Sequence, residues 1–286
     1  MLSGKQIVCT VFFALFLIIS NSSVAQSFGI YVSPGIMNYG GDLQKKAYTF
    51  SQAEFAISGG LLYNFNHFTI RGSLTYGRIQ GSDSTGGYKG RNLSFKSKLG
   101  EGNLMLQYDL FKLDEKKITP YIFAGAGLFY YNPYTFYNGK RVYLRRLGTE
   151  GQGLSIYPDR KPYSLTQFTI PVGLGVKYKI TDAWQVALEF CSRFLFTDYL
   201  DDVSTTYPDE TALLNGRGQL AVNVSFRGDE LDPAKTFPDE GSARGNASRN
   251  DNYYTSALSI IYIFPNSDLF GAGRHKKMKS LKCPKL

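Results

Sequence analysis

Eight segments of the chain alternate apolar and polar residues with a period of two, which constrains the fold more than any other feature of the sequence. In chain order the eight segments are 28–39, 53–65, 67–79, 93–111, 118–131, 165–180, 184–197 and 252–264. Alternation of this kind over about ten residues is typical of a β-strand with one apolar and one polar face. We expect a bulge near Gly100, where the pattern of 93–111 weakens. The segment 118–131 is apolar on both faces, so its pattern does not indicate which face points outward.

The connections between these segments alternate between short and long. The short connections are 66, 112–117 and 181–183, and the long ones are 40–52, 80–92, 132–164 and 198–251. Outer-membrane barrels have this layout, with short periplasmic turns, long outer loops and both chain ends on the periplasmic side. The sequence therefore predicts an all-β fold, an eight-stranded antiparallel transmembrane β-barrel of the outer membrane with long extracellular loops and short periplasmic turns.

Two soluble β folds compete with this interpretation. A lipocalin-like barrel also has eight strands, but its apolar face points inward around a ligand. A two-sheet sandwich does not explain the alternation of loop lengths. We call the alternate strand positions that carry apolar residues the apolar parity, and the positions between them the polar parity. Residues of the apolar parity are Tyr, Phe or Trp at the strand ends, as in aromatic girdles. Residues of the polar parity are small and often Gly, which suits a tight lumen. An outward Arg71 or Arg193 would cost about 2–4 kcal/mol at the bilayer midplane. These features favour the membrane barrel.

The first residues are typical of a secretory signal peptide. Lys5 precedes an apolar run from Ile7 to Ile19, and small residues lead to an expected cleavage between Ala25 and Gln26. The apolar run is too short to span a bilayer as a helix. We therefore expect a signal peptide over 1–25, a barrel domain over 26–264, a basic periplasmic tail over 265–286, and a final location in the outer membrane.

The net charge of +9 is concentrated in the tail. Six bases follow the last acid, Asp268, and they are Arg274, Lys276, Lys277, Lys279, Lys282 and Lys285. A local excess on an exported chain does not indicate a nucleic-acid partner. The tail instead suggests a contact with periplasmic proteins, and the barrel suggests outer-membrane lipid as its surroundings.

An eight-stranded barrel is just wide enough inside for side chains to fill it. Charged residues of the polar parity are expected to form a structural network in this lumen, and they are Arg71, Glu101, Asp109, Glu189 and Arg193. Opposite charges can pair there away from water. The alternative is a narrow polar path or a switchable plug.

The sequence gives little support for catalysis, a cofactor or a metal. The histidines, His67 and His275, stand in a short turn and in the tail, and no Gly-x-Ser-x-Gly motif is present. Acids of the last long loop could bind calcium through oxygen ligands, and they are Asp198, Asp201, Asp202, Asp209 and Glu210. Their spacing matches no calcium-binding motif, so we expect them to lie in a solvated loop. The stretch 219–226 alternates like a strand and is expected to extend the barrel wall or fold over its mouth.

Loop residues carry a resemblance to a known family. The segments concerned are Asn38–Leu43 (NYGGDL), Asp198–Ser204 (DYLDDVS), Arg244–Asn246 with Asn250-Asp251, and Lys282–Lys285 (KCPK). They resemble the PorG-like family of outer-membrane barrels, whose best-known member belongs to the type IX secretion system. The resemblance implies a barrel associated with the periplasmic ring of that machinery and does not imply catalysis. The long stretch 212–240 departs from the shorter loops expected in that family.

Two functions follow from these observations. The first is a non-enzymatic barrel that anchors a secretion complex, with periplasmic ring proteins or lipoproteins as partners of its basic tail. The second is a ligand-binding or small-solute transport barrel whose large outer loops capture the ligand.

Overall fold

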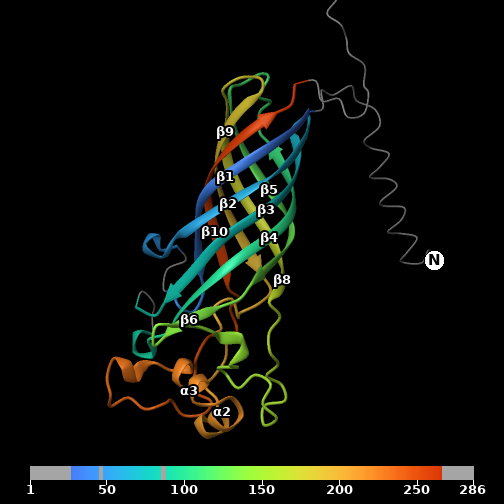
Figure 1. The fold of residues 1–286 in the computed structure, drawn as a ribbon. Coiled ribbons are helices and arrows are strands. Elements are labelled where there is room, and N and C mark those ends of the chain that lie inside the picture. The colour runs from blue at the N-terminus through green and yellow to red at the C-terminus, as the bar shows by residue number, and fades with distance from the viewer. Residues whose placement is uncertain (1–26, 45–47, 85–87, 266–286) are drawn as a thin grey trace, which may run out of the picture.

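The computed structural model describes residues 27–44, 48–84 and 88–265, and eight long antiparallel strands form a closed barrel in it (Figure 1). The strands are β1 (Ser27–Gly40), β2 (Glu54–Phe65), β3 (Phe68–Ser82), β4 (Ser94–Asp109), β5 (Ile118–Tyr131), β8 (Thr166–Lys179), β9 (Trp184–Leu195) and β10 (Asn252–Ile263). Each strand pairs with the barrel strands before and after it, and the pairing of β10 with β1 closes the sheet. Closure gives every barrel strand a hydrogen-bonded neighbour on both sides. The predicted fold class is confirmed.

The strand bounds agree with the predicted segments to within a few residues. The bulge expected near Gly100 is wrong, because β3 and β4 pair one to one without interruption from Ser82–Ser94 to Phe68–Tyr108. Gly100 and Gly102 occupy outward positions where the pattern leads one to expect apolar side chains. The alternation therefore weakens although the strand itself is regular.

The apolar parity faces outward. Leu74 is 74% exposed, Val172 40% and Phe190 39%, whereas Arg71 is only 3% exposed. Exposed aromatic rings border this apolar band, at Phe68, Tyr108, Tyr178 and Trp184 toward the short turns and at Tyr76, Tyr130, Phe168 and Phe194 toward the long loops. A lipocalin-like barrel would have the opposite arrangement, so that alternative is wrong. A continuous apolar exterior of this kind is stable against hydrocarbon rather than water.

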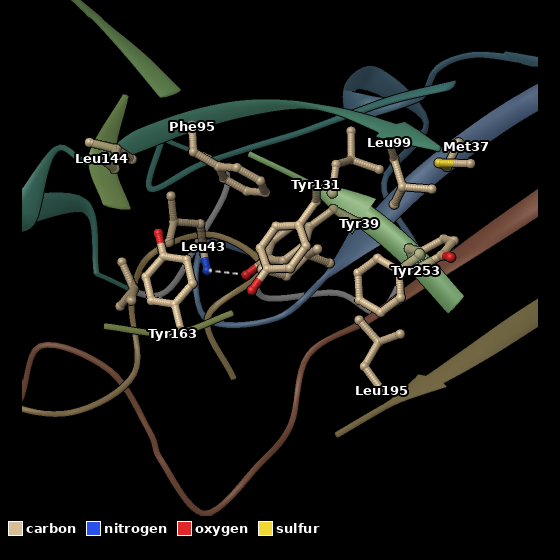
Figure 2. Packing of buried hydrophobic residues seen from close by; sticks show 14 of the residues in the cluster. Met37, Tyr39, Leu43, Phe95, Leu99, Tyr131, Leu144, Tyr163, Leu195 and Tyr253 are labelled. Carbon is tan, nitrogen blue, oxygen red and sulfur yellow. Dashed lines mark hydrogen bonds between the residues drawn. The ribbon is translucent and has the colours of Figure 1, made fainter. Parts of the chain in front are cut away.

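Aromatic and aliphatic side chains fill the lumen at the long-loop end. We call this group the aromatic plug, and its rings are Tyr39, Phe95, Phe129, Tyr131, Tyr163 and Tyr253. Figure 2 shows all of these rings except Phe129 labelled, packed together with Met37, Leu99 and Leu195. The strand β5 is apolar on both faces because its inward residues are aromatic and help to fill the lumen. Tyr121, Phe123, Phe129 and Tyr131 point inward, while Ile122 and Leu128 are exposed.

The long loops gather at one end of the barrel, opposite the ends of the described chain (Figure 1). They contain a hairpin of β6 (Tyr134–Tyr137) and β7 (Lys140–Tyr143), and the helices α2 (Glu210–Arg217) and α3 (Gln219–Ser225). Four short 3-10 turns complete the elements, at Phe50–Gln52, Lys89–Arg91, Leu144–Arg146 and Gly228–Glu230. In the described part of the chain, no helix has the length and apolar character needed to cross a membrane.

The stretch 219–226 does not extend the barrel wall as a strand, and it lies among the long loops at the mouth of the barrel, which was the other alternative (Figure 1). It forms α3, which starts directly after Gly218, a residue with a φ of 84° that ends α2. Ala221, Val222 and Leu213 of α2 are buried against one another in a small cluster of their own. The apolar residues of α3 thus meet a neighbouring helix, and a short run of seven residues is too brief for its periodicity to separate the two structures.

The outward band gives the first prediction. Leu74 lies in the apolar band of β3, between its middle and the border at Tyr76, so Leu74→Arg should lower the free energy of unfolding in lipid vesicles by about 1–3 kcal/mol. Urea titration of the vesicle-inserted barrel, followed by its heat-modifiable migration on gels, measures this change. The matched control is Leu231→Arg in the outer loops, where Leu231 is 58% exposed. Equal effects of the two substitutions would show that Leu74 does not face hydrocarbon.

Candidate functional site

Inward-facing ion pairs cross the middle of the lumen, and the central one joins β3 to β9. The Arg71 guanidinium donates to both carboxylate oxygens of Glu189, with Nη1–Oε1 at 2.7 Å and Nη2–Oε2 at 3.2 Å. The Tyr121 hydroxyl also donates to Glu189 Oε1, at 2.5 Å. The rings of Tyr31 and Phe123 lie against the guanidinium, with centroids 4.8 Å and 5.1 Å from its carbon. A buried ion pair needs this additional satisfaction to offset its desolvation.

A second pair lies in the same part of the lumen. Arg193 Nε of β9 contacts Glu101 Oε2 of β4 at 3.2 Å. Tyr253 donates its hydroxyl proton to the same oxygen at 3.0 Å, and Asn103 donates to Glu101 Oε1 at 2.8 Å. Arg193 also donates to the Thr255 hydroxyl. Hydrogen-bond donors thus reach both oxygens of the Glu101 carboxylate.

Asp109 has a partner that the sequence analysis did not single out. Lys177 Nζ on β8 lies 2.9 Å from Asp109 Oδ2, and Gln107 donates to Asp109 Oδ1 at 2.6 Å. Lys177 stands on the polar parity of its strand, and that parity was the signal that could have placed it in the network. Four of the five lumen residues proposed from the sequence form two ion pairs with each other, Arg71 with Glu189 and Arg193 with Glu101. The fifth, Asp109, pairs with Lys177 instead.

These side chains leave little space at mid-barrel. The cavity lined by Arg71, Glu189, Arg193 and their neighbours has a volume of about 20 Å³, room for about one water molecule. A wider polar cavity of about 500 Å³ opens at the short-turn end, beside Asp109 and Lys177. With the aromatic plug above them, the ion pairs leave no continuous route for a solute through the described lumen.

Three of the four segments that carried the family resemblance come together above the aromatic plug, and the fourth, 282–285, lies outside the described residues. The Tyr39 hydroxyl donates to Asp201, and the backbone N–H of Asn246 donates to Asp42 Oδ2 at 2.7 Å. Asp251 accepts from the backbone N–H of Leu200 at 2.9 Å. Segments that are far apart in the chain therefore contact one another and form one unit with a buried interior. We call it the outer cap, made of 38–44, 83–84, 88–93, 149–152, 197–207 and 242–251.

Two arginines pair with acids inside the outer cap. Arg91 holds Asp83 through Nε at 2.9 Å and Nη2 at 2.7 Å. Arg244 Nη1 donates to Glu150 Oε1 at 2.9 Å and to the backbone carbonyl of Asp202 at 2.6 Å. Glu150 accepts further bonds, among them one from the backbone N–H of Ser204 at 2.8 Å. These charge-assisted bonds tie the loops to one another.

Four other carboxyls of the outer cap have no ion-pair partner among the described residues. They are Asp42, which is half-buried, and Asp198, Asp201 and Asp251, which are buried. Asp198 is 7% exposed, and its oxygens have no hydrogen-bond partner in the described chain. Burial raises the pKa of Asp198 to about 8 and that of Asp201 to about 8. Burial and the nearby Asp201 carboxyl raise the pKa of Asp251 well above its usual range. The expectation that the pair Asp201-Asp202 lies in solvent is wrong, because the loops cover both residues. Asp201 is 1% exposed and Asp202 is 0% exposed.

The suggested calcium ligands do not share one place. Asp209 caps α2 by accepting from the backbone N–H of Ala212 at 2.7 Å, and Glu210 is exposed at the start of that helix. Asp198, Asp201 and Asp202 are buried in the outer cap instead. Nowhere in the described chain do three His, Cys, Asp or Glu side chains converge as ligands of one metal ion would.

His67 lies in the short turn between β2 and β3, where its ring nitrogen Nδ1 is 2.8 Å from the backbone oxygen of Asp109. The expected cleavage at Ala25 and Gln26, the tail residues Arg274 to Lys285, and His275 lie outside the described residues. The predictions made for them stay predictions.

Comparison with known proteins assigns the chain to a protein family. The model of a family described as "Domain of unknown function (DUF6089)" matches residues 5–223, well over half of the chain. This chain belongs to the DUF6089 family. The DUF6089 match includes seven barrel strands and ends inside the last long loop, before β10. No curated protein matches this DUF6089 chain.

Several solved outer-membrane proteins resemble the DUF6089 chain at low similarity. Neisserial surface protein A (NspA) is 11% identical with a TM-score of 0.44, covering 84% of this chain and 99% of its own. A major outer membrane protein from Thermus thermophilus is 10% identical with a TM-score of 0.38, covering 84% and 100%. Ail, the attachment invasion locus protein of Yersinia pestis, is 12% identical with a TM-score of 0.37, covering 84% and 97%. Values this low carry no information on function.

The central ion pair gives the second prediction. Glu189→Gln leaves the Arg71 guanidinium buried without its counter-charge, which should lower the free energy of unfolding by about 3–5 kcal/mol. The double substitution Arg71→Met with Glu189→Leu should lose less, because it removes both charges. Asp182→Asn, in the exposed pair with Lys179, is the control and should leave the unfolding midpoint unchanged. Urea unfolding in detergent micelles measures all three. A double variant less stable than Glu189→Gln would contradict this account.

The unpaired acids of the outer cap give the third prediction. Asp198 and Asp201 bind a proton more tightly in the folded cap than in the unfolded chain, where the ordinary value is 3.8. The free energy of cap opening should therefore fall as pH rises from about 4 to about 8. Cleavage of the loops by proteinase K in micelles, normalised at each pH to an unfolded substrate, should become faster over this range.

Two substitutions sharpen this test. Asp198→Asn removes one titrating group and should flatten the pH dependence of cleavage. Asp229→Asn, at an exposed position of the same loop, should leave it unchanged. Cleavage that does not vary with pH in the unsubstituted protein would show that the buried acids do not govern cap opening.

Proposed function

We propose that this chain is a non-enzymatic outer-membrane barrel that anchors a protein complex, and that the complex is the type IX secretion machinery. The observation that carries this proposal is the filled lumen. Ion pairs at Arg71–Glu189 and Arg193–Glu101 cross its middle, and the aromatic plug blocks its outer half. A barrel whose interior is packed can contact partners only through its two ends and its lipid-facing wall.

The outer-membrane location is supported by the apolar exterior and by the sequence of the first residues. The outward band and its aromatic borders suit a bilayer, and a signal peptide over 1–25 would deliver the chain to the periplasm. The long loops then face the outside of the cell. The described chain ends at Pro265, directly after β10 and at the short-turn end of the barrel. The basic tail over 265–286 therefore starts on the periplasmic side.

The association with type IX secretion is supported by the loop segments that resemble the PorG-like family. The three of those segments that the structure describes meet in the outer cap, where Tyr39, Asp42, Asp202 and Arg244 contact one another's loops. A partner on the periplasmic side would bind the tail through its six bases, which lie beyond the last acid of the chain. Attraction of this kind guides association and fixes orientation. The proposed partners are periplasmic ring proteins or lipoproteins of that machinery.

Solute transport, the other function considered, has no support from the lumen. A transport barrel needs a route for its solute, and the mid-barrel cavity holds about 20 Å³. Capture of a ligand by the outer loops would require an open cleft among them. Around Glu150, Arg91 and Arg244 the outer cap instead buries its loops against one another. The cavities at this end of the barrel lie outside that buried region, one of about 240 Å³ beside Tyr88 and Tyr207 and one on the barrel wall beside Arg141.

Complementation in the source bacterium tests the anchoring proposal. A deletion strain would receive the full chain, a chain ending at Pro265, or a chain with the six tail bases changed to Gln. We expect deletion to abolish export of type IX cargo. We expect both tail variants to reach the outer membrane as heat-modifiable barrels but to co-purify poorly with ring subunits after cross-linking.

The two parts of the proposal fail separately. Normal cargo export from the deletion strain would overturn the link to type IX secretion. Co-purification of the tail variants at the level of the full chain would overturn docking through the tail and leave the barrel assignment intact.

A further inference from the structure

A cavity of about 320 Å³ lies on the outer wall of the barrel, where β4 and β5 meet the β6–β7 hairpin. Its lining combines two bases, Lys98 and Arg141, with four tyrosines, Tyr76, Tyr130, Tyr134 and Tyr143, and it contains no acid. The Arg141 guanidinium carbon lies 4.5 Å from the centre of the Tyr134 ring. We call this cavity, together with the neighbouring Arg78 and Lys96, the basic groove.

The strand register gives the basic groove its shape. Gly100 of β4 lies between Tyr76 of β3 and Tyr130 of β5, and Gly102 lies between Leu74 and Leu128 in the same way. A glycine floor is thus bordered on each side by a tyrosine and then by a leucine. A Cβ atom at Gly100 would meet nothing within 4 Å. Packing within the protein does not require glycine there, and the space is open along the wall.

The bases at the top of the basic groove repel one another. Arg78 and Lys98 are direct cross-strand partners, and Lys96 follows on the same outward face of β4. Like charges directly opposite in an antiparallel pair destabilise the sheet. Arg78, Lys96, Lys98 and Arg141 form no ion pair within the described residues. An anion bound between them would remove the repulsion.

The position of these bases along the barrel axis indicates which kind of anion could bind between them. Arg78 follows Tyr76 by two residues on β3, a rise of about 7 Å along the strand. Tyrosines of this kind mark the boundary between hydrocarbon and water in membrane barrels. The bases therefore lie one layer above that boundary, at the level of lipid headgroups, while Leu74 and Leu128 lie below it among acyl chains.

We propose that the basic groove binds the phosphate-bearing headgroup of an outer-leaflet lipid, with one acyl chain lying over Gly100 and Gly102. Lys98, Arg78 and Arg141 hold the phosphate through charge-assisted hydrogen bonds. Tyr76 and Tyr130 border the upper part of the chain. This inference rests on the outer-membrane location proposed above, and it is independent of the link to secretion.

Lipid binding by the full chain in detergent micelles tests the inference. Native mass spectrometry would measure binding of lipid A carrying phosphate and of the same lipid with its phosphate removed. We expect the phosphorylated lipid to bind at least about tenfold more weakly to the double variant Lys98→Gln with Arg141→Gln. The lipid without phosphate should bind the double variant and the unsubstituted chain alike. Gly100→Leu should weaken binding of both lipids, because its side chain occupies the place of the acyl chain.

The controls separate the lipid from a free anion and from general charge. Lys161→Gln with Arg249→Gln removes two exposed bases elsewhere in the outer loops and should leave binding unchanged. Inorganic phosphate at the same concentration should not displace the lipid. Equal binding by the unsubstituted chain and the Lys98/Arg141 double variant would overturn the proposal, and displacement by phosphate would replace the lipid with an anion site. The measurement uses refolded protein, so loss of cargo export in cells does not bear on it.

A stability measurement gives an independent readout. Without lipid, Lys98→Gln should raise the urea midpoint of the barrel, because it relieves the repulsion from Arg78. With phosphorylated lipid A in excess, the same substitution should lower the midpoint relative to the unsubstituted chain. A purely structural role for Lys98 would change the midpoint in the same direction under both conditions, and that result would contradict the inference.

Discussion

The closed ladder of backbone hydrogen bonds that runs from β1 to β10 is the constraint on which the rest of the structure depends. Backbone groups that face hydrocarbon cannot bond to water, so each strand needs a neighbour on both sides. Closure with eight strands sets the width of the lumen. Inward side chains then meet across it, as Arg71 of β3 meets Glu189 of β9 although these strands are not neighbours. The ion pairs are a consequence of closure.

The sequence predicted the strands, their number and, in all of them except 118–131, the face to which the side chains belong, because a period of two is a local property. Arg71 and Glu189 could be placed inside, because they share the polar face of their strands and the opposite face is apolar and ends in aromatic residues. Their pairing could not be predicted, because it depends on how far each strand is staggered around the barrel. Arg71 and Glu189 are 118 residues apart, and no local pattern connects them. For the same reason the pairing of Asp109 with Lys177 was not predicted.

The outer cap was the least predictable part of the structure. Asp201 and Asp202 look like solvated loop residues in sequence, and their burial arises only because segments near 42, 150, 202 and 244 fold onto one another. Such burial leaves no periodic signal. The short stretch of α3 shows a related limit, because alternation over seven residues fits a strand and one side of a helix about equally well. The family resemblance singled out several cap residues, yet it contained no information on their contacts.

Charge at the long-loop end is divided by the barrel wall. Unpaired acids such as Asp198 and Asp251 gather inside the outer cap, while unpaired bases such as Lys98 and Arg78 face outward on β3 and β4. The two sets cannot neutralise each other, because the register fixes each strand residue on one face and a shift by one residue would turn the apolar band inward. The acids of the outer cap and the outward bases of β3 and β4 are therefore neutralised by different partners. Inside the cap the partner is the proton, which burial makes the acids retain. Outside, the bases face the headgroup layer, where the available counter-charge is an anionic lipid.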